Sequence, residues 1–298
     1  MNFSHKISLA LVAAVAISAI AQPTAVFAIS VQVPSPSVVA ATKAENFFIQ
    51  GNEKYQKGDY QGALAAYSQA IVLNPNYAQA YNNRGSARRT LGDSKGAIAD
   101  FNQALRINPN YAQAYNNRGN ARSQLGDKQG AVADFNQALR INPNLDAAYN
   151  NRGIVRRALG DKQGAVADYN QALRINPNFA AAYNNRGIAR SQLGDKKGGV
   201  ADFNQALRIN PNFAEAYSNR GEARFGLGDK QGAVADFNQA LRINPNLADA
   251  YYNRGEARSE LGNKQGAIQD FKKAADLFQK QGDKSNYQKA INFLRRLQ

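Results

Sequence analysis

The sequence predicts an all-α protein, a solenoid in which seven helix–turn–helix units stack in one dimension and a final helix covers the last unit. The first observation is a 34-residue period that runs without a gap over 44–281. The phrase GAVADFNQALRINPN at 130–144 returns at 232–246, and at 164–178 with Tyr in place of Phe. The second observation is that a Gly-Asp or Gly-Asn step divides each period into two segments of helical length. Such a period indicates stacked units that bury their apolar faces against their neighbours.

Residues 1–28 are predicted to be a secretory signal peptide. Lys6 supplies the positive start, a 14-residue apolar run follows at 7–20, and small residues then offer cleavage after Ala28 or after Ala21. The run is shorter than the roughly 20 residues that span a bilayer, which favours cleavage over an uncleaved anchor. The sequence therefore predicts export, with a periplasmic or extracellular location.

The helices of each unit have recognisable ends. Residues 29–43 contain two prolines and no periodicity, which predicts a flexible linker before the first unit. In the second unit the first helix ends at Gly92-Asp93, and the aspartate can cap the next helix. The second helix ends before Pro109, because proline cannot continue a helix and disfavours helical geometry in the preceding residue. The same stop recurs at Pro75, Pro143, Pro177, Pro211 and Pro245.

The repeated unit resembles the tetratricopeptide repeat family over about four-fifths of the chain. In the second unit the matching framework is Tyr81, Gly85, Ala97, Phe101, Ala104 and Pro109. The resemblance implies a right-handed superhelix in which the first helix of each unit lines a concave face. It also implies that the recurring glycine lets paired helices approach closely, and that the protein is a non-catalytic scaffold for a protein or peptide partner.

Three features depart from the family pattern. Rows of arginine that begin at Arg84 and Arg88 stand where the family usually has Leu and often has Tyr. Because an unpaired buried charge destabilises by several kcal/mol, we predict that each arginine of the Arg84 row pairs with an aspartate of the row that begins at Asp100. Gly199 stands where the other units have Ala, and a helical glycine costs about 1 kcal/mol relative to alanine. The fifth unit is therefore predicted to be the least stable.

Residues 282–298 are predicted to form a capping helix. Ile291, Leu294 and Leu297 fall at helical spacing and give the segment one apolar face. Solenoids require such terminal elements. A tail that binds a partner is the alternative.

Asparagines are predicted to form a peptide-binding ladder on the concave face. An amide both donates and accepts, so a column of amides can hold the main chain of an extended peptide. The column is similar to the ladder of protein O-linked N-acetylglucosaminyltransferases. The alternative is that these side chains hold neighbouring units together or are solvated. The predicted peptide-binding residues, at the fifth and sixth places of the units, are Asn82, Asn83, Asn116, Asn117, Asn150, Asn151, Asn184, Asn185, Asn219 and Asn253.

Places that vary on the repeated scaffold are predicted to give the groove its specificity. The early groove carries basic side chains, the late groove carries acidic ones, and two isoleucines lie between them. This order predicts a ligand that is acidic where it meets the second to fourth units and basic at the sixth and seventh, although drift alone would give the same pattern. The residues concerned are Arg89, Asn120, Ile154, Arg157, Ile188, Glu222, Phe225 and Glu256.

Composition narrows the chemistry. The chain has no Cys, and its only His is His5, inside the predicted signal peptide. This excludes His-based triads, thiol nucleophiles and His or Cys metal sites from the mature chain, so we predict no enzyme, no cofactor and no metal. The net charge of +15 gives the alternative function, a basic surface that attaches to an anionic envelope polymer or membrane surface. Nucleic acid is not favoured, because no stacking aromatics accompany the exposed basic residues. A homo-oligomer stays open, because near-identical units can stack end to end.

Overall fold

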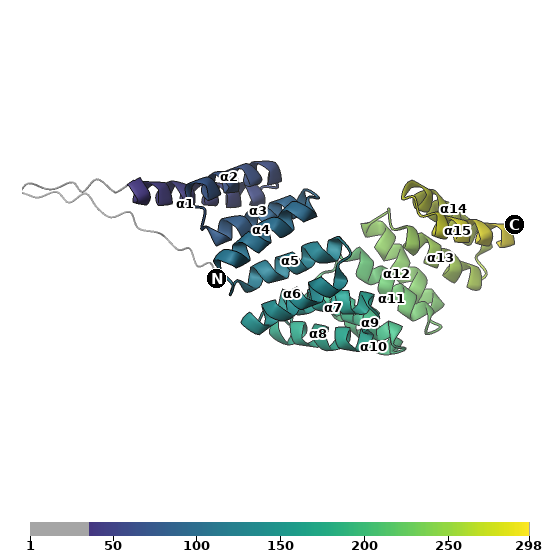
Figure 1. Ribbon diagram of the computed structural model, residues 1–298. Coiled ribbons are helices and arrows are strands. Elements are labelled where there is room, and N and C mark those ends of the chain that lie inside the picture. The colour runs from purple at the N-terminus through teal and green to yellow at the C-terminus, as the bar shows by residue number, and fades with distance from the viewer. Residues whose placement is uncertain (1–35, 298) are drawn as a thin grey trace, which may run out of the picture.

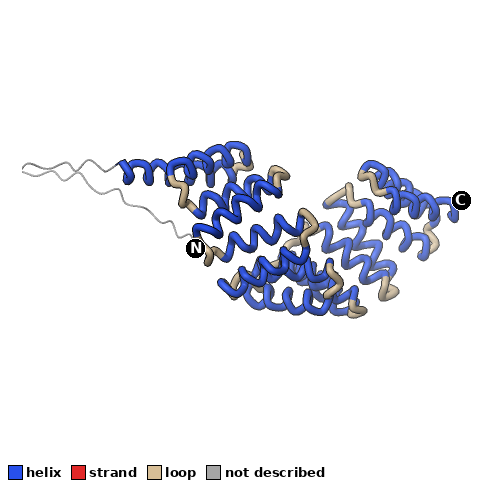
Figure 2. Tube along the Cα trace, in the orientation of Figure 1, coloured by secondary structure: helices blue, strands red, loops and turns tan. Residues whose placement is uncertain are grey.

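The computed structural model describes residues 36–297, and within this range the regular structure is α-helical, with no strand (Figure 2). The predicted signal peptide and its cleavage sites lie outside the described residues. No helix of the described range is both long and apolar enough to cross a membrane. The helices are α1 (Pro36–Gln56), α2 (Tyr60–Leu73), α3 (Ala78–Thr90), α4 (Ser94–Ile107), α5 (Ala112–Gln124), α6 (Lys128–Ile141), α7 (Asp146–Ala158), α8 (Lys162–Ile175), α9 (Ala180–Gln192), α10 (Lys196–Ile209), α11 (Ala214–Phe225), α12 (Lys230–Ile243), α13 (Ala248–Glu260), α14 (Lys264–Lys280) and α15 (Lys284–Leu297).

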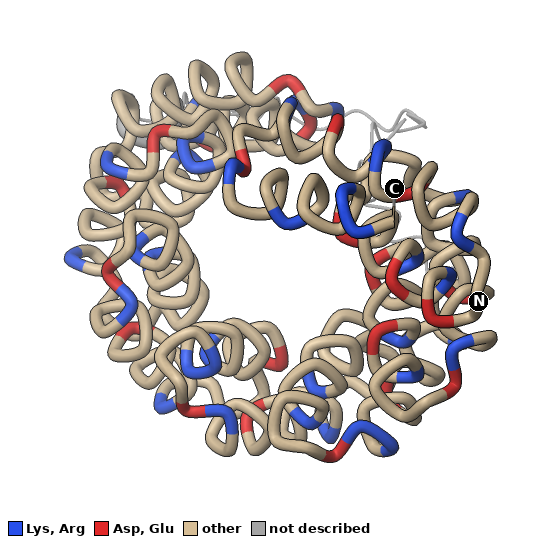
Figure 3. The backbone as a smooth tube through the Cα atoms, turned by 90° about the vertical axis from the view of Figure 1, so that its right-hand side faces the viewer, with Lys and Arg blue, Asp and Glu red and all other residues tan. Residues whose placement is uncertain are grey.

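The helices pair within each unit, and the pairs stack into the predicted superhelical solenoid (Figure 1). From α1 to α13, each odd-numbered helix contacts the next odd-numbered helix. No two even-numbered helices of the described range approach each other to a similar extent. The first helices of the units therefore lie on the inner side of the curve and the second helices on the outer side. In the perpendicular view the helices follow a ring around an open centre (Figure 3).

The predicted helix boundaries are confirmed, and each has a local cause. At the first boundary of the second unit, Gly92 adopts φ +90°, a conformation that side chains disfavour. The Asp93 carboxylate then accepts a hydrogen bond from the Gly96 N–H at 2.8 Å and caps α4. At the second boundary Asn108 is extended, as a residue before proline should be. The chain thus changes direction at the same two places in the first six units, whereas α14 of the seventh unit, which lacks the proline, continues to Lys280.

Helix α1 begins earlier than the sequence predicted. Residues 36–43, assigned to a flexible linker, belong to α1, so that part of the prediction is wrong. Proline is well suited to the first position of a helix, where its missing N–H would have no partner in any case, and α1 begins at Pro36. The period marks where the repeated unit starts, but it does not limit how far a helix extends before it.

Each helix pair closes around an aromatic ring that packs on a glycine. Phe101 is fully buried, and a Cβ added to Gly85 would lie 2.8 Å from its ring. The glycine therefore provides the close approach that the sequence resemblance implied. The same arrangement recurs in the pairs Gly119–Phe135, Gly153–Tyr169, Gly187–Phe203, Gly221–Phe237 and Gly255–Phe271.

The predicted arginine–aspartate pairs are present from the second to the seventh unit. Arg84 donates through Nε and Nη2 to the two carboxylate oxygens of Asp100, at 3.0 and 2.6 Å. Arg88 Nη1 lies 3.3 Å from Asp100 Oδ2, so one buried carboxylate receives two guanidinium groups. The equivalent bidentate pairs are Arg118–Asp134, Arg152–Asp168, Arg186–Asp202, Arg220–Asp236 and Arg254–Asp270.

The first arginine of each unit also connects neighbouring units. Arg118 on α5 donates through Nη1 to Asn102 Oδ1 on α4, at 2.7 Å. Its guanidinium lies 5.2 Å from the ring centroid of Tyr115. One side chain therefore contacts its own helix, the second helix of its unit through Asp134 and the second helix of the preceding unit.

Helix α15 covers the end of the seventh unit. Leu294 is buried against Phe271, with Ile291 and Leu297 packed on the same cluster. The Phe293 ring stacks on Phe271 with 5.0 Å between the centroids. The face expected from the sequence thus shields the last pair of helices from solvent.

Replacing Asp134 by alanine should lower the stability of the array by about 3 kcal/mol, because Arg118 would remain half-buried without a counterion and Arg122 would keep only the exposed Asp127, 3.7 Å away. Asp127→Ala in the same unit is the matched control. It removes an exposed N-cap and should cost only about 1 kcal/mol. Urea unfolding followed by circular dichroism measures both, and equal losses would contradict the structural role of the buried carboxylate.

Gly199→Ala should stabilise α10 by up to about 1 kcal/mol, provided that Ser191, whose Oγ occupies the space of the missing Cβ, changes rotamer and that α9 shifts slightly, because the Gly187 carbonyl oxygen would lie 2.9 Å from the new Cβ. Ser123 beside Ala131 shows that the third unit accommodates this pair of residues. Gly187→Ala is the contrasting variant and should destabilise, since the new Cβ would lie 2.7 Å from the Phe203 ring. Amide hydrogen exchange in α9 and α10 reports both, and a loss of protection in Gly199→Ala would refute the first expectation.

Candidate functional site

The predicted peptide-binding asparagines lie on the odd-numbered helices, and most of them hydrogen-bond to one another from unit to unit. Asn117 Nδ2 donates to Asn82 Oδ1 at 3.0 Å, and Asn151 Nδ2 donates to Asn116 Oδ1 at 3.1 Å. The other links of this amide ladder are Asn83 to Asn52, Asn185 to Asn150 and Asn219 to Asn184. The ladder therefore connects α1 to α11 along the inner side of the solenoid.

The fifth-place asparagines are buried and contact the following unit. Asn82, Asn116, Asn150 and Asn184 are only 3–6% exposed, and the oxygen of each accepts a hydrogen bond from the following unit. Their side chains reach the neighbouring helix and hold adjacent units together, the alternative that the sequence left open. Asn82 also belongs to the lining of the cavity at the N-terminal end of the groove, and peptide binding by this row stays a prediction.

The sixth-place asparagines are half-buried and keep unused hydrogen-bonding capacity. Asn117 donates one amide hydrogen within the ladder at close distance, and an asparagine amide has two. Asn83 and Asn117 line a cavity at the N-terminal end of the groove, and Asn219 and Asn253 line one at the C-terminal end. These side chains combine a structural contact with an accessible amide.

The ladder ends between α11 and α13. Ser218 occupies the fifth place of the sixth unit, where the four preceding units have asparagine. Asn253 consequently meets no amide on α11, and within the described residues its side chain makes no hydrogen bond. It faces the two C-terminal cavities instead.

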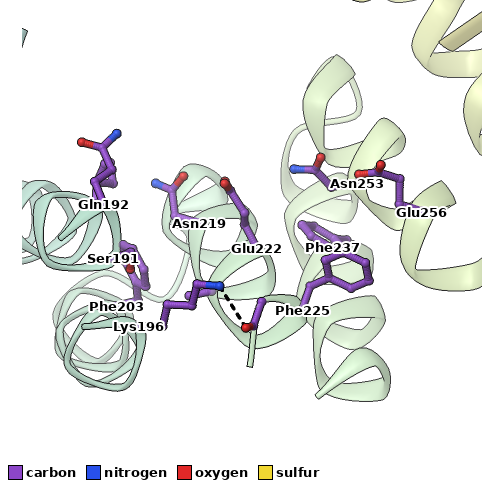
Figure 4. Close-up of a pocket in the computed structure, with 13 residues that line it drawn as sticks. Ser191, Gln192, Lys196, Phe203, Asn219, Glu222, Phe225, Phe237, Asn253 and Glu256 are labelled. Carbon is purple, nitrogen blue, oxygen red and sulfur yellow. Dashed lines mark hydrogen bonds between the residues drawn. The ribbon is translucent and has the colours of Figure 1, made fainter. Parts of the chain in front are cut away.

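The C-terminal cavity has a volume of about 460 Å³ and lies between α9, α11 and α13 (Figure 4). Glu222 and Glu256 point their carboxylates to the same side as the amides of Asn219 and Asn253, and phenylalanine rings lie below them in this view. Ile188 and Phe225, both predicted specificity residues, belong to its lining. The cavity thus joins four of the predicted specificity residues and two of the predicted peptide-binding asparagines, from three successive units.

The carboxylates of this cavity repel one another. Partial removal from water raises the pKa of Glu222 above its usual value, and the charge of Asp249 adds to this effect. The pKa of Glu256 is raised by the same cause, with contributions from Glu260 and Glu222. Within the described chain neither group forms an ion pair, whereas the nearby Glu260 pairs with Lys230 at 2.8 Å. Negative charge therefore accumulates on the wall of the groove.

The N-terminal cavity, of about 420 Å³ between α1, α3 and α5, has the opposite character. Arg89 is its only charged lining residue, and the Arg89 Nε is buried without a hydrogen-bond partner. Tyr55 and several amides complete the lining. Asn52 was not among the predicted site residues, yet it accepts hydrogen bonds from both Asn83 and Tyr67. It stands at the ninth place, which varies among the units, and this variation could have identified it.

The remaining predicted specificity residues lie on the inner helices between the two cavities. Asn120 on α5 is half-buried, and Ile154 on α7 is 37% exposed. Arg157, also on α7, has a buried Nε without a partner. Helix α7 therefore carries both a basic and an apolar side chain of the predicted set, and the order of charges along the groove stays a prediction.

Glu222→Gln should raise the melting temperature at pH 7, and the gain should shrink as the pH falls. Because its pKa is higher in the native state, ionised Glu222 lowers stability above that pKa, and this penalty vanishes below the unfolded-state value of about 4.3. The difference from wild type should thus be largest at pH 7 and smallest near about pH 3.5. Glu260→Gln, which breaks the pair with Lys230, should give no gain at pH 7. A pH-independent difference would contradict the assignment.

Family models match most of the array. A model described as "TPR repeat" matches residues 51–92, 85–126, 155–194, 192–228 and 227–262. Models described as "Tetratricopeptide repeat" match residues 112–145 and 248–281. Together these ranges cover more than half of the chain.

Solved structures share the fold at low identity. A tetratricopeptide repeat protein from Parabacteroides merdae is 23% identical with a TM-score of 0.65, over 84% of this chain and 99% of that one. The Cut9–Hcn1 hetero-tetramer of the APC/C is 16% identical with a TM-score of 0.70, over 88% of this chain and 48% of the matched chain. PilF of Pseudomonas aeruginosa is 16% identical with a TM-score of 0.65, over 74% and 99%. The matched segments and the shared fold agree, and the chain belongs to the tetratricopeptide repeat family.

Proposed function

We propose that this protein is a non-catalytic scaffold that binds an extended protein segment along its concave groove. Tetratricopeptide repeats form a fold for protein–protein interaction, and YrrB, which is 23% identical over 62% of this chain with a TM-score of 0.50, is described as a TPR protein with an unusual peptide-binding site. The observation that carries the proposal is the pair of cavities on the inner helices, each lined by sixth-place asparagines. On this proposal the protein acts after export, at the location that its signal peptide predicts.

A bound segment would find its main-chain partners in the sixth-place row. Each of these amides recurs once per unit, so successive units offer donors to successive parts of an extended chain. Because the ladder and the arginine–aspartate pairs hold the side chains in place, little ordering of the groove is needed on binding. Side chains at the ninth and twelfth places would then select the sequence.

Much of the positive charge is already engaged within the units. Twelve arginines contact six buried aspartates, which weakens the basis for attachment through a basic surface. Salt distinguishes the two modes, because attachment through six or more charges loses roughly a thousandfold or more in affinity between 50 and 200 mM salt. A groove that holds the main chain by amides should lose much less.

Selection from a library of displayed 12-residue peptides against the full chain tests the proposal. Ile154→Glu places a charge on the groove wall and should weaken selected peptides about tenfold, since an uncompensated polar group costs about 1–3 kcal/mol. The matched control is Val72→Glu on α2, an exposed aliphatic side chain outside the row of inner helices, which should change nothing. Alanine variants of the ladder asparagines are unsuitable, because they would also loosen the contacts between units.

Equal effects of the two variants, failure to select any peptide, or a steep loss with salt would each overturn the groove as the binding surface. Hydrogen exchange supplies a second measurement. A bound peptide should protect amides of the odd-numbered helices from α3 to α13, while the even-numbered helices remain unchanged.

A further inference from the structure

The C-terminal cavity has the chemistry of a site for one basic side chain. We propose that the cavity between α9, α11 and α13 binds an arginine side chain of the partner segment, with its guanidinium between Glu222 and Glu256. This inference rests on the proposed function and adds the specificity of the groove. It stands on the cavity itself, on its uncompensated charge, on unpartnered polar groups and on its apolar wall.

The carboxylates of the cavity have no ion-pair partner within the described chain, and Lys196 acts on Glu222 only at longer range. These carboxylates belong to Glu222 and Glu256, which both line the cavity. Lys196 also lines the cavity, but its Nζ donates to the Gly226 carbonyl oxygen at 2.9 Å and lies at the opposite side from the carboxylates (Figure 4). A ligand cation would relieve the repulsion between the two carboxylates. Arginine suits such a pair because its planar fork presents five donors to two separate acceptors.

Two polar groups of the lining have no hydrogen-bond partner within the described chain. This observation supports the site independently of the charge of Glu222 and Glu256. Within the described part of the chain the Asn253 side chain makes no hydrogen bond, because the amide ladder stops at Ser218. The Ser191 Oγ is fully buried without a hydrogen-bond partner, and it occupies the space left by the missing Cβ of Gly199. Buried polar atoms without partners are rare in folded proteins. A guanidinium with several donors can satisfy the Asn253 amide oxygen in addition to the carboxylates, whereas the Ser191 hydroxyl is covered by Gly199.

The cavity also offers apolar surface for the stem of such a side chain. Phe225 takes the twelfth place of the sixth unit, where the other units carry Tyr, Arg or Ser. Together with Ile188 it forms a half-buried wall of the cavity. The methylene groups of arginine pack on such surface while the charged group contacts the carboxylates, and the guanidinium is attracted to an aromatic ring.

The N-terminal cavity serves as an internal control for the C-terminal cavity. The N-terminal cavity is similar in volume, but its lining has no carboxylate and contains Arg89. It should therefore not bind a cation. Phe225 lines the C-terminal cavity, and Gly199 lies against its lining residue Ser191. Ser218 lines an adjoining cavity that shares Asn219, Glu222 and Asn253 with the C-terminal cavity. The proposed specificity therefore arises where the units differ from one another.

The inference can be tested without a known partner. Nα-acetyl-arginine N-methylamide is titrated into the full chain, and the side-chain carboxyl signals of Glu222 and Glu256 are followed by NMR. Saturable shifts of both signals are expected, with no shift at Asn52 or Asn83. The double variant Glu222→Gln, Glu256→Gln should bind this probe at least about tenfold more weakly. Removing like-charge repulsion should not impair its folding.

Controls separate charge recognition from general effects. Glu260→Gln removes the same charge one turn away on α13 and should leave the affinity unchanged. The norleucine analogue of the probe should bind much more weakly than the arginine compound. Equal binding of the two probes, or unchanged affinity in the double variant, would overturn the proposal.

The peptide selection distinguishes this inference from the proposed function. Peptides that bind the groove without enrichment of arginine or lysine at one position, or with the same enrichment in the double variant, would overturn the arginine site and leave the groove intact. Binding of the arginine probe without any selected peptide would overturn the extended segment and leave the site intact. Enrichment of lysine over arginine would show that the site prefers an ammonium group, and this would overturn the proposal that a guanidinium binds both carboxylates.

Discussion

The structure depends on a bidentate ion pair that recurs inside every unit from the second to the seventh. An arginine of the first helix holds a buried aspartate of the second and reaches the preceding unit through a further hydrogen bond, as Arg118 does with Asp134 and Asn102. Buried ion pairs add little net stability compared with apolar packing, but they penalise arrangements that leave one partner alone. In a chain of near-identical units this penalty has a specific consequence. Units that stack out of register would leave charges unpaired, so the pairs select one way of stacking.

The amide ladder adds a second set of contacts between units on the inner side. Because both sets repeat with the period, they produce a regular curve and a row of amides that is nearly uniform from α3 to α9. A uniform row of amides can hold a main chain but cannot distinguish sequences. Discrimination requires positions where the repetition is broken, and these gather at α9, α11 and α13, where the ladder ends and carboxylates line a cavity.

Several parts of the candidate site were predictable from the sequence, and the reasons differ. The pairing of Arg84 with Asp100 followed from the need of a half-buried charge for a partner, and the structure confirms it. The separate roles of Asn82 and Asn83 were not predictable, because adjacent residues on a helix point about 100° apart and only the neighbouring unit decides which one is covered. The role of Asn253 was not predictable either, because its neighbours in the sequence resemble those of the other sixth-place asparagines. Only the packing of α11 against α13 shows that Ser218 offers it no amide. Likewise, the period could not show that α1 extends back to Pro36.

The amino-acid sequence alone determined the architecture, the helix boundaries and the internal ion pairs, because each of these follows from local rules repeated every 34 residues. Glycine and proline set the turns, apolar spacing sets the buried faces, and a charge in a helix interface requires its opposite. Tertiary structure decided which amides are covered by the next unit, where the ladder ends and which carboxylates share a cavity. These features depend on the rotation and separation between successive units, and such distances arise only when the whole array is packed.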